Sequence, residues 1–204
     1  SLQGGTARNA LPREATAIVA IPEAGAGKLS TCLAEWESLL RRELAGVDAG
    51  IALSCSSAPG APAVLAPHEQ SVWLASLHAA PHGVRRMSRQ VPGVVETSNN
   101  LGMVALDAQG GTCNFMVRSL LDSGSMGLAD EIVSLFALSG TSAEKAGYYP
   151  GWAPNPDSQL LALCQAVYRQ EFGAESTVQV IHAGLECGII GAKYPGMDIV
   201  SFGP

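Results

Sequence analysis

The segment Val94-Val-Glu-Thr-Ser-Asn-Asn-Leu-Gly-Met-Val-Ala-Leu106 decides the fold of this chain. It has the apolar and β-branched composition of a strand. Asp107-Ala-Gln-Gly-Gly111 follows it with the Asp and Gly residues that are typical of a tight turn. The next segment, Cys113–Leu121, again has the composition of a strand. Together the three segments predict a long β-hairpin.

Outward from this hairpin, the sequence alternates between strand and helix patterns. The helix that begins near Leu29 has the clearest pattern, because Leu29, Leu33 and Leu40 recur at helical spacing and Gly46 follows its end. We expect further strands at 14–21, 50–56 and 143–149, and helices at 29–44, 68–79 and 126–138.

The character of the sequence changes after Tyr149. Residues 150–157 form a proline-rich connector, in which Asn155 can cap a helix and Pro156 is tolerated at its first position. The remainder predicts a βαβ-like unit, with a helix to Gly173, a strand at 178–181, a short helix at 186–193 and a strand at 198–202. We therefore expect an α+β domain over 1–149, with a mixed sheet that carries helices on one face, and an α/β segment over 150–204.

Composition excludes several classes of protein. Hydrophobic residues make up 47% and charged residues 15%, so the chain is too apolar to be disordered. No apolar stretch approaches the roughly 20 residues that cross a membrane. A net charge of −6, with no basic run longer than Arg85-Arg86, argues against nucleic acid as a partner. Five scattered cysteines without C-x-x-C spacing indicate reduced thiols in a cytoplasmic protein.

The residues alone contain no complete catalytic site. His78 and His82 have the spacing of a helical metal pair, but Pro81 lies between them and breaks the helical geometry. We interpret them as loop histidines at the end of a helix. No zincin, phosphate-loop or nucleophile-elbow motif is found in the sequence.

Two charged residues have unusual positions. Arg118 lies in an otherwise apolar strand, so it needs an internal salt bridge, a position at the rim, or a ligand such as a substrate carboxylate. Glu186 follows a predicted strand and begins a predicted helix. It is either a plain carboxylate in a first helical turn, or part of a ligand-binding loop at the carboxyl edge of an α/β sheet. The pattern leaves these alternatives open.

Several separate motifs are spread over essentially all 204 residues of the sequence. They are Gly4-Gly-Thr-Ala-Arg-Asn-Ala-Leu-Pro-Arg13, Val94–Gly102 with Val117-Arg-Ser119, Gly147–Ser158, Ile181–Gly188 and Met197-Asp-Ile-Val-Ser-Phe-Gly-Pro204. These motifs resemble those of bacterial aminoacyl-histidine dipeptidases. Members of that family are non-specific dipeptidases of the cytosol, related to carnosinases and to the di-zinc aminopeptidases.

The resemblance implies that the chain is about the C-terminal half of a zinc-dependent dipeptidase that cleaves Xaa-His and other dipeptides. Residues 1–149 would be most of an inserted lid and dimerisation domain, without its first strand and helix. Residues 150–204 would be the returning part of the catalytic domain, ending before the last zinc-binding His. Two zinc ions are expected in the full-length protein, but no catalytic or metal-binding residue is expected in these 204. The implied partners are the rest of the catalytic domain and a second subunit.

Five residues are substrate-binding candidates, and three of them, Arg118, Asn9 and Glu186, are carried over from the family. Arg118 corresponds to the arginine that clamps the C-terminal carboxylate of the dipeptide, and Asn9 to a polar residue that points towards the substrate. Gly184 and Glu186 belong to the glycine-rich loop beside the metal centre. Asn99 departs from the apolar residue that is common in the family, and Asn100 is expected to be the ligand-facing member of this pair. A second interpretation is a dimerisation, substrate-gating or peptide-binding module without catalysis, and we expect the isolated chain to be inactive.

Overall fold

The computed structural model describes residues 1–60, 63–181 and 186–203. Its central feature is the predicted hairpin, formed by β4 (Val95–Asp107) and β5 (Gly110–Ser119). Asp107 Oδ1 accepts a hydrogen bond from Gln109 N at 2.8 Å inside the turn. Gly110 has φ of 136°, which a side chain would disfavour. The turn residues noted in the sequence therefore close the hairpin as predicted.

β4 is the strand that organises the sheet. One edge of β4 pairs with β5, and the other edge is shared by β1 (Leu2–Gly4) and β3 (Gly83–Met87). β2 (Ala15–Ala17) extends the sheet beyond β1. All pairings in the described part of the chain are antiparallel, rather than mixed as the sequence predicts. The segments 50–56 and 143–149, which were expected to add strands, pair with nothing described.

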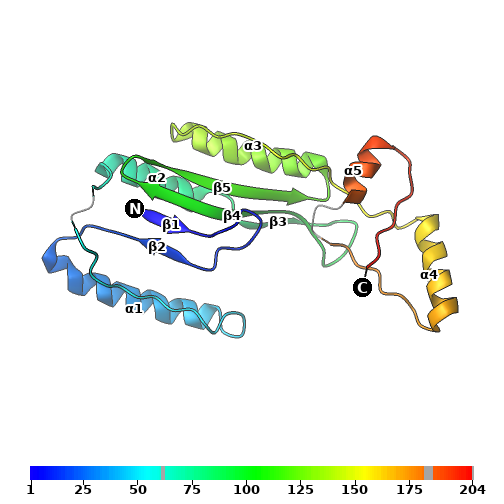
Figure 1. Ribbon diagram of the computed structural model, residues 1–204, viewed down its shortest axis with the longest axis horizontal. Helices are drawn as coiled ribbons and strands as arrows, with labels where there is room; N and C mark the ends of the chain where they lie inside the picture. The colour runs from blue at the N-terminus through cyan, green and yellow to red at the C-terminus, as the bar shows by residue number, and fades with distance from the viewer. Residues whose placement is uncertain (61–62, 182–185, 204) are drawn as a thin grey trace.

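Two helices cover one face of this sheet, as predicted. α3 (Asp122–Leu138) packs on β4 and β5, and α2 (Pro67–Ala79) packs on α3 (Figure 1). The buried core consists of Leu128, Ile132 and Phe136 of α3 with Ala80, packed against Phe115 and other residues of β5. The α+β class is therefore confirmed.

The N-terminal helix has a different environment. α1 (Ala26–Glu43) follows the short 3-10 turn η1 (Glu23–Gly25) and lies on the β2 side of the sheet (Figure 1). None of its residues is buried, and Trp36 is 53% exposed. Among the described elements, α1 contacts η1 alone. Its apolar residues therefore do not contribute to the core.

Residues after 149 form two helices, α4 (Gln159–Phe172) and α5 (Glu186–Lys193), which lie beyond the end of the hairpin (Figure 1). The strands predicted at 178–181 and 198–202 are not formed. A strand requires a neighbour for its N–H and C=O groups, and no described strand lies beside these segments. None of the described helices is long and apolar enough to cross a membrane.

The start of α4 is held by the segment that ends the chain. Ser158, rather than the predicted Asn155, is the N-cap, and its Oγ accepts a hydrogen bond from Leu161 N at 3.0 Å. Ser158 Oγ donates to Asp198 Oδ1 at 2.7 Å, and Leu160 N donates to Asp198 Oδ2 at 2.9 Å. Asn155 instead accepts a hydrogen bond from Asp157 N in a local turn, so the helix begins three residues later than a cap at Asn155 implies.

We expect this connection to weaken in acid. The hydrogen bonds from Leu160 N and Ser158 lower the pKa of Asp198 below its usual range. Because the folded pKa is the lower one, the stabilisation is complete above the unfolded pKa of about 3.9 and is lost as pH falls through the folded pKa. Relative to the intrinsic rate at each pH, hydrogen exchange at the amides of Leu160 and Leu161 should therefore accelerate in acid.

The Asp198→Ala variant should show the same acceleration already at neutral pH. Glu171→Ala, which removes an exposed carboxylate from the same helix, is the matched control and should leave both amides protected. Unchanged protection in Asp198→Ala would contradict the role given to this carboxylate.

Candidate functional site

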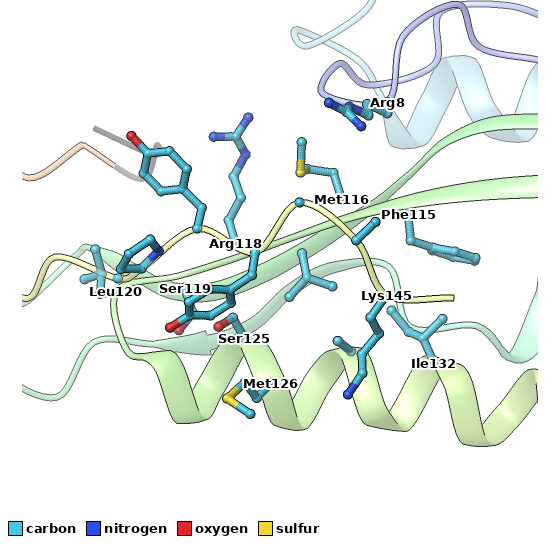
Figure 2. Close-up of a pocket in the computed structure, with 18 of the residues that line it drawn as sticks. Arg8, Phe115, Met116, Arg118, Ser119, Leu120, Ser125, Met126, Ile132 and Lys145 are labelled. Atoms are coloured by element: carbon cyan, nitrogen blue, oxygen red, sulfur yellow. The ribbon is translucent and has the colours of Figure 1, made fainter. Parts of the chain in front are cut away.

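A hollow of about 980 Å³ lies where β5 meets α3 and the segment 144–152 (Figure 2). Most of its walls are apolar or aromatic. β5 contributes Phe115, Met116 and Val117, α3 contributes Met126, Ala129, Ile132 and Val133, and the connecting segment contributes Tyr148, Tyr149 and Trp152. Ligand sites in proteins are commonly concave, mostly apolar and fitted with a few polar groups.

Arg118 is a charged residue of this hollow. It lies near the end of β5, opposite Ser98 of β4, and its side chain is half-buried. Within the described ranges, no carboxylate lies within ion-pair distance of its guanidinium. The internal salt bridge that the sequence allowed is therefore not formed among these residues. A guanidinium in this state can bind a carboxylate through two parallel hydrogen bonds.

The strand end that carries Arg118 is fixed from the opposite face. Ser119 follows Arg118, and its Oγ lies 2.8 Å from Thr97 Oγ1 and accepts a hydrogen bond from Leu121 N at 3.1 Å. A Cβ on Gly124 of α3 would lie 2.5 Å from Ser119 Oγ, so α3 packs directly against this pair. Strand and helix thus hold Arg118 at a defined place.

The loop after β1 brings Asn9 over the same sheet. Asn100 Nδ2 donates to Arg8 O at 3.0 Å and to Ala10 O at 3.1 Å. The backbone is therefore held on both sides of Asn9. Asn9 itself is exposed. The amide nitrogen of Asn100, expected to face a ligand, therefore holds the loop that presents Asn9.

The two remaining candidates lie in or beside α5. Gly184 lies outside the described residues. Glu186 is exposed at the first position of α5, where the helix dipole favours a carboxylate, and it does not line the described part of the hollow. α5 itself is close, because a Cβ on Gly188 would lie 2.7 Å from Pro150 O in the connector that walls the hollow.

The titratable groups near the hollow do not make a nucleophile. Burial raises the pKa of the Cys113 thiol to about 11, so it stays protonated and unreactive at neutral pH. Desolvation and the neighbouring Asp122 raise the pKa of Tyr148, which keeps its phenol protonated. Neither the Cys113 thiol nor the Tyr148 phenol is therefore activated as a nucleophile.

The described residues also do not fit a metal centre. They contain no group of three or more His, Cys, Asp or Glu side chains that could hold an ion. His82 Nδ1 accepts a hydrogen bond from Leu101 N at 3.2 Å, as expected of a loop histidine rather than of a metal ligand. The side chains in the described ranges are therefore unsuited to holding zinc by themselves.

One feature of the hollow was missed by sequence reasoning. Arg8 also lines it, although the sequence shows only an exposed arginine after a Gly-Gly turn. The sequence feature that could have indicated the position of Arg8 is Asn100. Its side-chain amide lies in β4, next to the strand of Arg118, and can hold a loop that passes over the sheet. That contact joins residues 92 positions apart, which local pattern does not reveal.

Two comparisons with known proteins return a match, whereas no family model matches the chain. It is 38% identical over 201 residues to the cytosol non-specific dipeptidase of Escherichia coli K12, covering 98% of this chain and 41% of that protein. Its structure matches the crystal structure of aminoacylhistidine dipeptidase from Vibrio alginolyticus with a TM-score of 0.93 and 39% identity, covering 100% of this chain and 41% of that one. The chain thus spans about two fifths of the length of these relatives. Since both matches run through essentially the whole chain, its sequence and its structure are similar to about two fifths of an aminoacylhistidine dipeptidase, as expected of a fragment of such a protein.

Proposed function

We propose that the full-length protein carrying this chain is a cytoplasmic dipeptidase that hydrolyses Xaa-His and other dipeptides. Both relatives are named as dipeptidases, and one is named as cytosolic. The observation that carries the proposal is Arg118, a half-buried arginine without a carboxylate partner in the described residues, at a largely apolar hollow. A dipeptide always ends in a carboxylate close to the scissile bond, so one arginine at a fixed place can position that bond.

We further propose that residues 1–149 form a lid and dimerisation domain, and that 150–204 belong to the catalytic domain. The division is supported by the packing, because the sheet, α2 and α3 share one core. By contrast, α4 packs on no other helix or strand in the described part of the chain. The Pro150-Gly151 connector separates the two parts, and Gly151 N donates to Asp122 Oδ1 at 2.7 Å.

In this proposal the chain binds and orients the substrate. Arg118 binds the C-terminal carboxylate of the dipeptide through two parallel hydrogen bonds. Asn9, held in place by Asn100, supplies a polar side chain to the peptide, and Gly184 and Glu186 are further substrate-binding residues of the proposal. Closure of the lid over the cleft would complete the site.

Two zinc ions are part of the proposal for the full-length protein. Such ions polarise a carbonyl and activate water for attack. Their ligands would come from outside the residues described here, whose side chains form no metal group.

The test compares the full-length protein with the isolated 204-residue chain. The full-length protein should hydrolyse alanylhistidine and contain zinc after dialysis. The isolated chain should bind no stoichiometric zinc and hydrolyse no dipeptide, because a di-zinc site needs several ligands that its described residues do not group together. Turnover by the isolated chain, or a full-length protein inert towards dipeptides, would contradict the proposal.

A second role, as a dimerisation and gating module without chemistry of its own, is favoured by α1. None of its residues is fully buried, Trp36 is 53% exposed, and α1 contacts no helix or strand of the described chain other than η1. A second subunit would cover such a surface. The molar mass from light scattering should therefore be that of a dimer, and a monomer mass would contradict this role.

A further inference from the structure

A second arginine, Arg8, lines the same hollow as Arg118. Figure 2 shows both guanidinium groups on the same side of β5, the side away from α3. Among the described residues, neither has an ion-pair partner. Lys145, which also lines the hollow, is paired with Asp130 at 2.5 Å, and the acidic Glu144 lies beyond ion-pair distance of both arginines. Two guanidinium groups thus remain available for anions.

The register of the sheet fixes how far apart the two arginines are anchored. Arg118 lies opposite Ser98, and Met116 lies opposite Asn100, the residue that holds the backbone of Arg8. Ser98 and Asn100 are two residues apart in β4, so they share a face of the sheet and lie roughly 7 Å apart along the strand. Asn100, which anchors Arg8, therefore lies two residues along β4 from Ser98, the residue opposite Arg118.

The backbone of Arg8 is built into the sheet rather than free on the surface. A Cβ on Gly102 would lie 2.6 Å from Arg8 O, and a Cβ on Gly5 would lie 1.9 Å from Gly102 O. Gly5 also has φ of 69°, which favours glycine. The pairing of β4 with β5 is irregular between Leu101 and Met103, a bulge of the kind that re-aims side chains near sites. Close packing of this kind leaves the Arg8 side chain as the mobile part.

We propose that Arg8 is a specificity-determining residue that binds a second carboxylate, so that the protein prefers dipeptides whose C-terminal residue has an acidic side chain. The inference rests on the proposed function, in which Arg118 binds the carboxylate of the peptide backbone. Two arginines on one side of β5, with anchors roughly 7 Å apart along the strand, can reach two carboxylates on one residue, and guanidinium is the group suited to binding each of them through two hydrogen bonds. A neutral side chain would leave Arg8 without a partner.

The experiment uses the full-length protein and two substrates, alanylglutamate and alanylglutamine, which have nearly the same shape and differ in one charge. We expect kcat/KM to favour alanylglutamate about fivefold, the upper range for an exposed charge pair, and mainly through KM. The Arg8→Gln variant should abolish this preference, and Arg8→Lys should keep part of it. Added salt should reduce the preference of the wild type.

The matched control is Arg13→Gln. Arg13 lies in the same loop, pairs with Asp48 at 3.3 Å and does not line the hollow, so the loss of its charge should leave the preference unchanged. A wild type without preference, or a preference that survives in Arg8→Gln or is lost equally in Arg13→Gln, would overturn the inference. The circular dichroism spectrum of each variant checks that the fold is retained.

Equilibrium binding by calorimetry separates this inference from the proposed function. If alanylglutamate binds more tightly than alanylglutamine through Arg8 but neither is cleaved, the inference stands and the proposed function fails. If both are cleaved and bound alike, the proposed function stands and the inference fails. If neither peptide binds, both are wrong.

Discussion

Replacement of Arg118 by Lys in the full-length protein is expected to lower kcat/KM for dipeptides about tenfold or more, largely through KM. Guanidinium offers two parallel donors to a carboxylate, whereas ammonium is a point charge. A hydrogen bond to a charged group contributes roughly 1.5–3 kcal/mol, and the loss of one such contact accounts for the tenfold change. The fold should be unaffected, since Arg118 forms no ion pair with any of the described residues.

The comparison of a dipeptide with its C-terminal amide tests the role of Arg118 directly. The amide lacks the carboxylate, so it should be a poor substrate of the wild type and lose little further activity in Arg118→Lys. Arg85→Lys, at an exposed arginine paired with Glu131 at 2.9 Å outside the large hollow, serves as the matched control. Equal losses on the acid and the amide, together with a lower melting temperature, would show that Arg118 is structural.

Replacement of Phe136 by Ala is expected to lower the free energy of unfolding by about 3–5 kcal/mol. Phe136 is 2% exposed, and its ring lies 5.6 Å from that of Phe115, centroid to centroid. It joins α3 to β5 in a core with few fully buried apolar side chains, so the cavity left behind cannot be refilled from elsewhere.

Urea unfolding followed by circular dichroism measures this loss. Leu138→Ala is the matched control, because Leu138 lies two residues further along α3 and is 89% exposed. It should change the unfolding midpoint little. A similar midpoint for Phe136→Ala and the wild type would show that the α3–β5 contact does not stabilise the domain.

The parts of the fold that the sequence predicts well are those with strong local patterns. The hairpin has a turn with the right residues between two long apolar segments, and Asp107 and Gly110 act in the structure as their types suggest. The helices near 68–79 and 126–138 also lie close to their predicted positions, at Pro67–Ala79 and Asp122–Leu138. In each of these elements the information is contained within one continuous stretch of sequence.

The parts that the sequence predicts poorly depend on distant partners. Residues 178–181 and 198–202 have strand composition but no neighbouring strand among the described residues, whereas the five-residue β3 exists because β4 lies beside it. Similarly, the start of α4 was placed too early, because Asp198 holds the helix at Ser158 and Leu160 from 40 and 38 residues away. Pairing and capping over such distances leave no local pattern.

In the candidate site, too, the sequence indicates what depends on local pattern and does not indicate what depends on distant contacts. Arg118 was identified because a charge in an apolar strand requires a reason, and its role remains a prediction. Arg8 was not, because an exposed arginine after a glycine turn looks like an ordinary surface residue. Its place beside the hollow follows from the hydrogen bonds of Asn100, which connect β4 to a loop that begins 95 residues earlier.

The shared strand β4 has a consequence for any movement of the domain. Arg118 is positioned by the pairing of β5 with β4, and the backbone of Arg8 is held by the side chain of Asn100 in β4. Both arginines are therefore anchored to the same strand. A rotation of the domain would carry them together as one rigid body. The separation of their backbone anchors would then be the same in open and closed states, and selection between substrates would already operate in the first encounter, before closure.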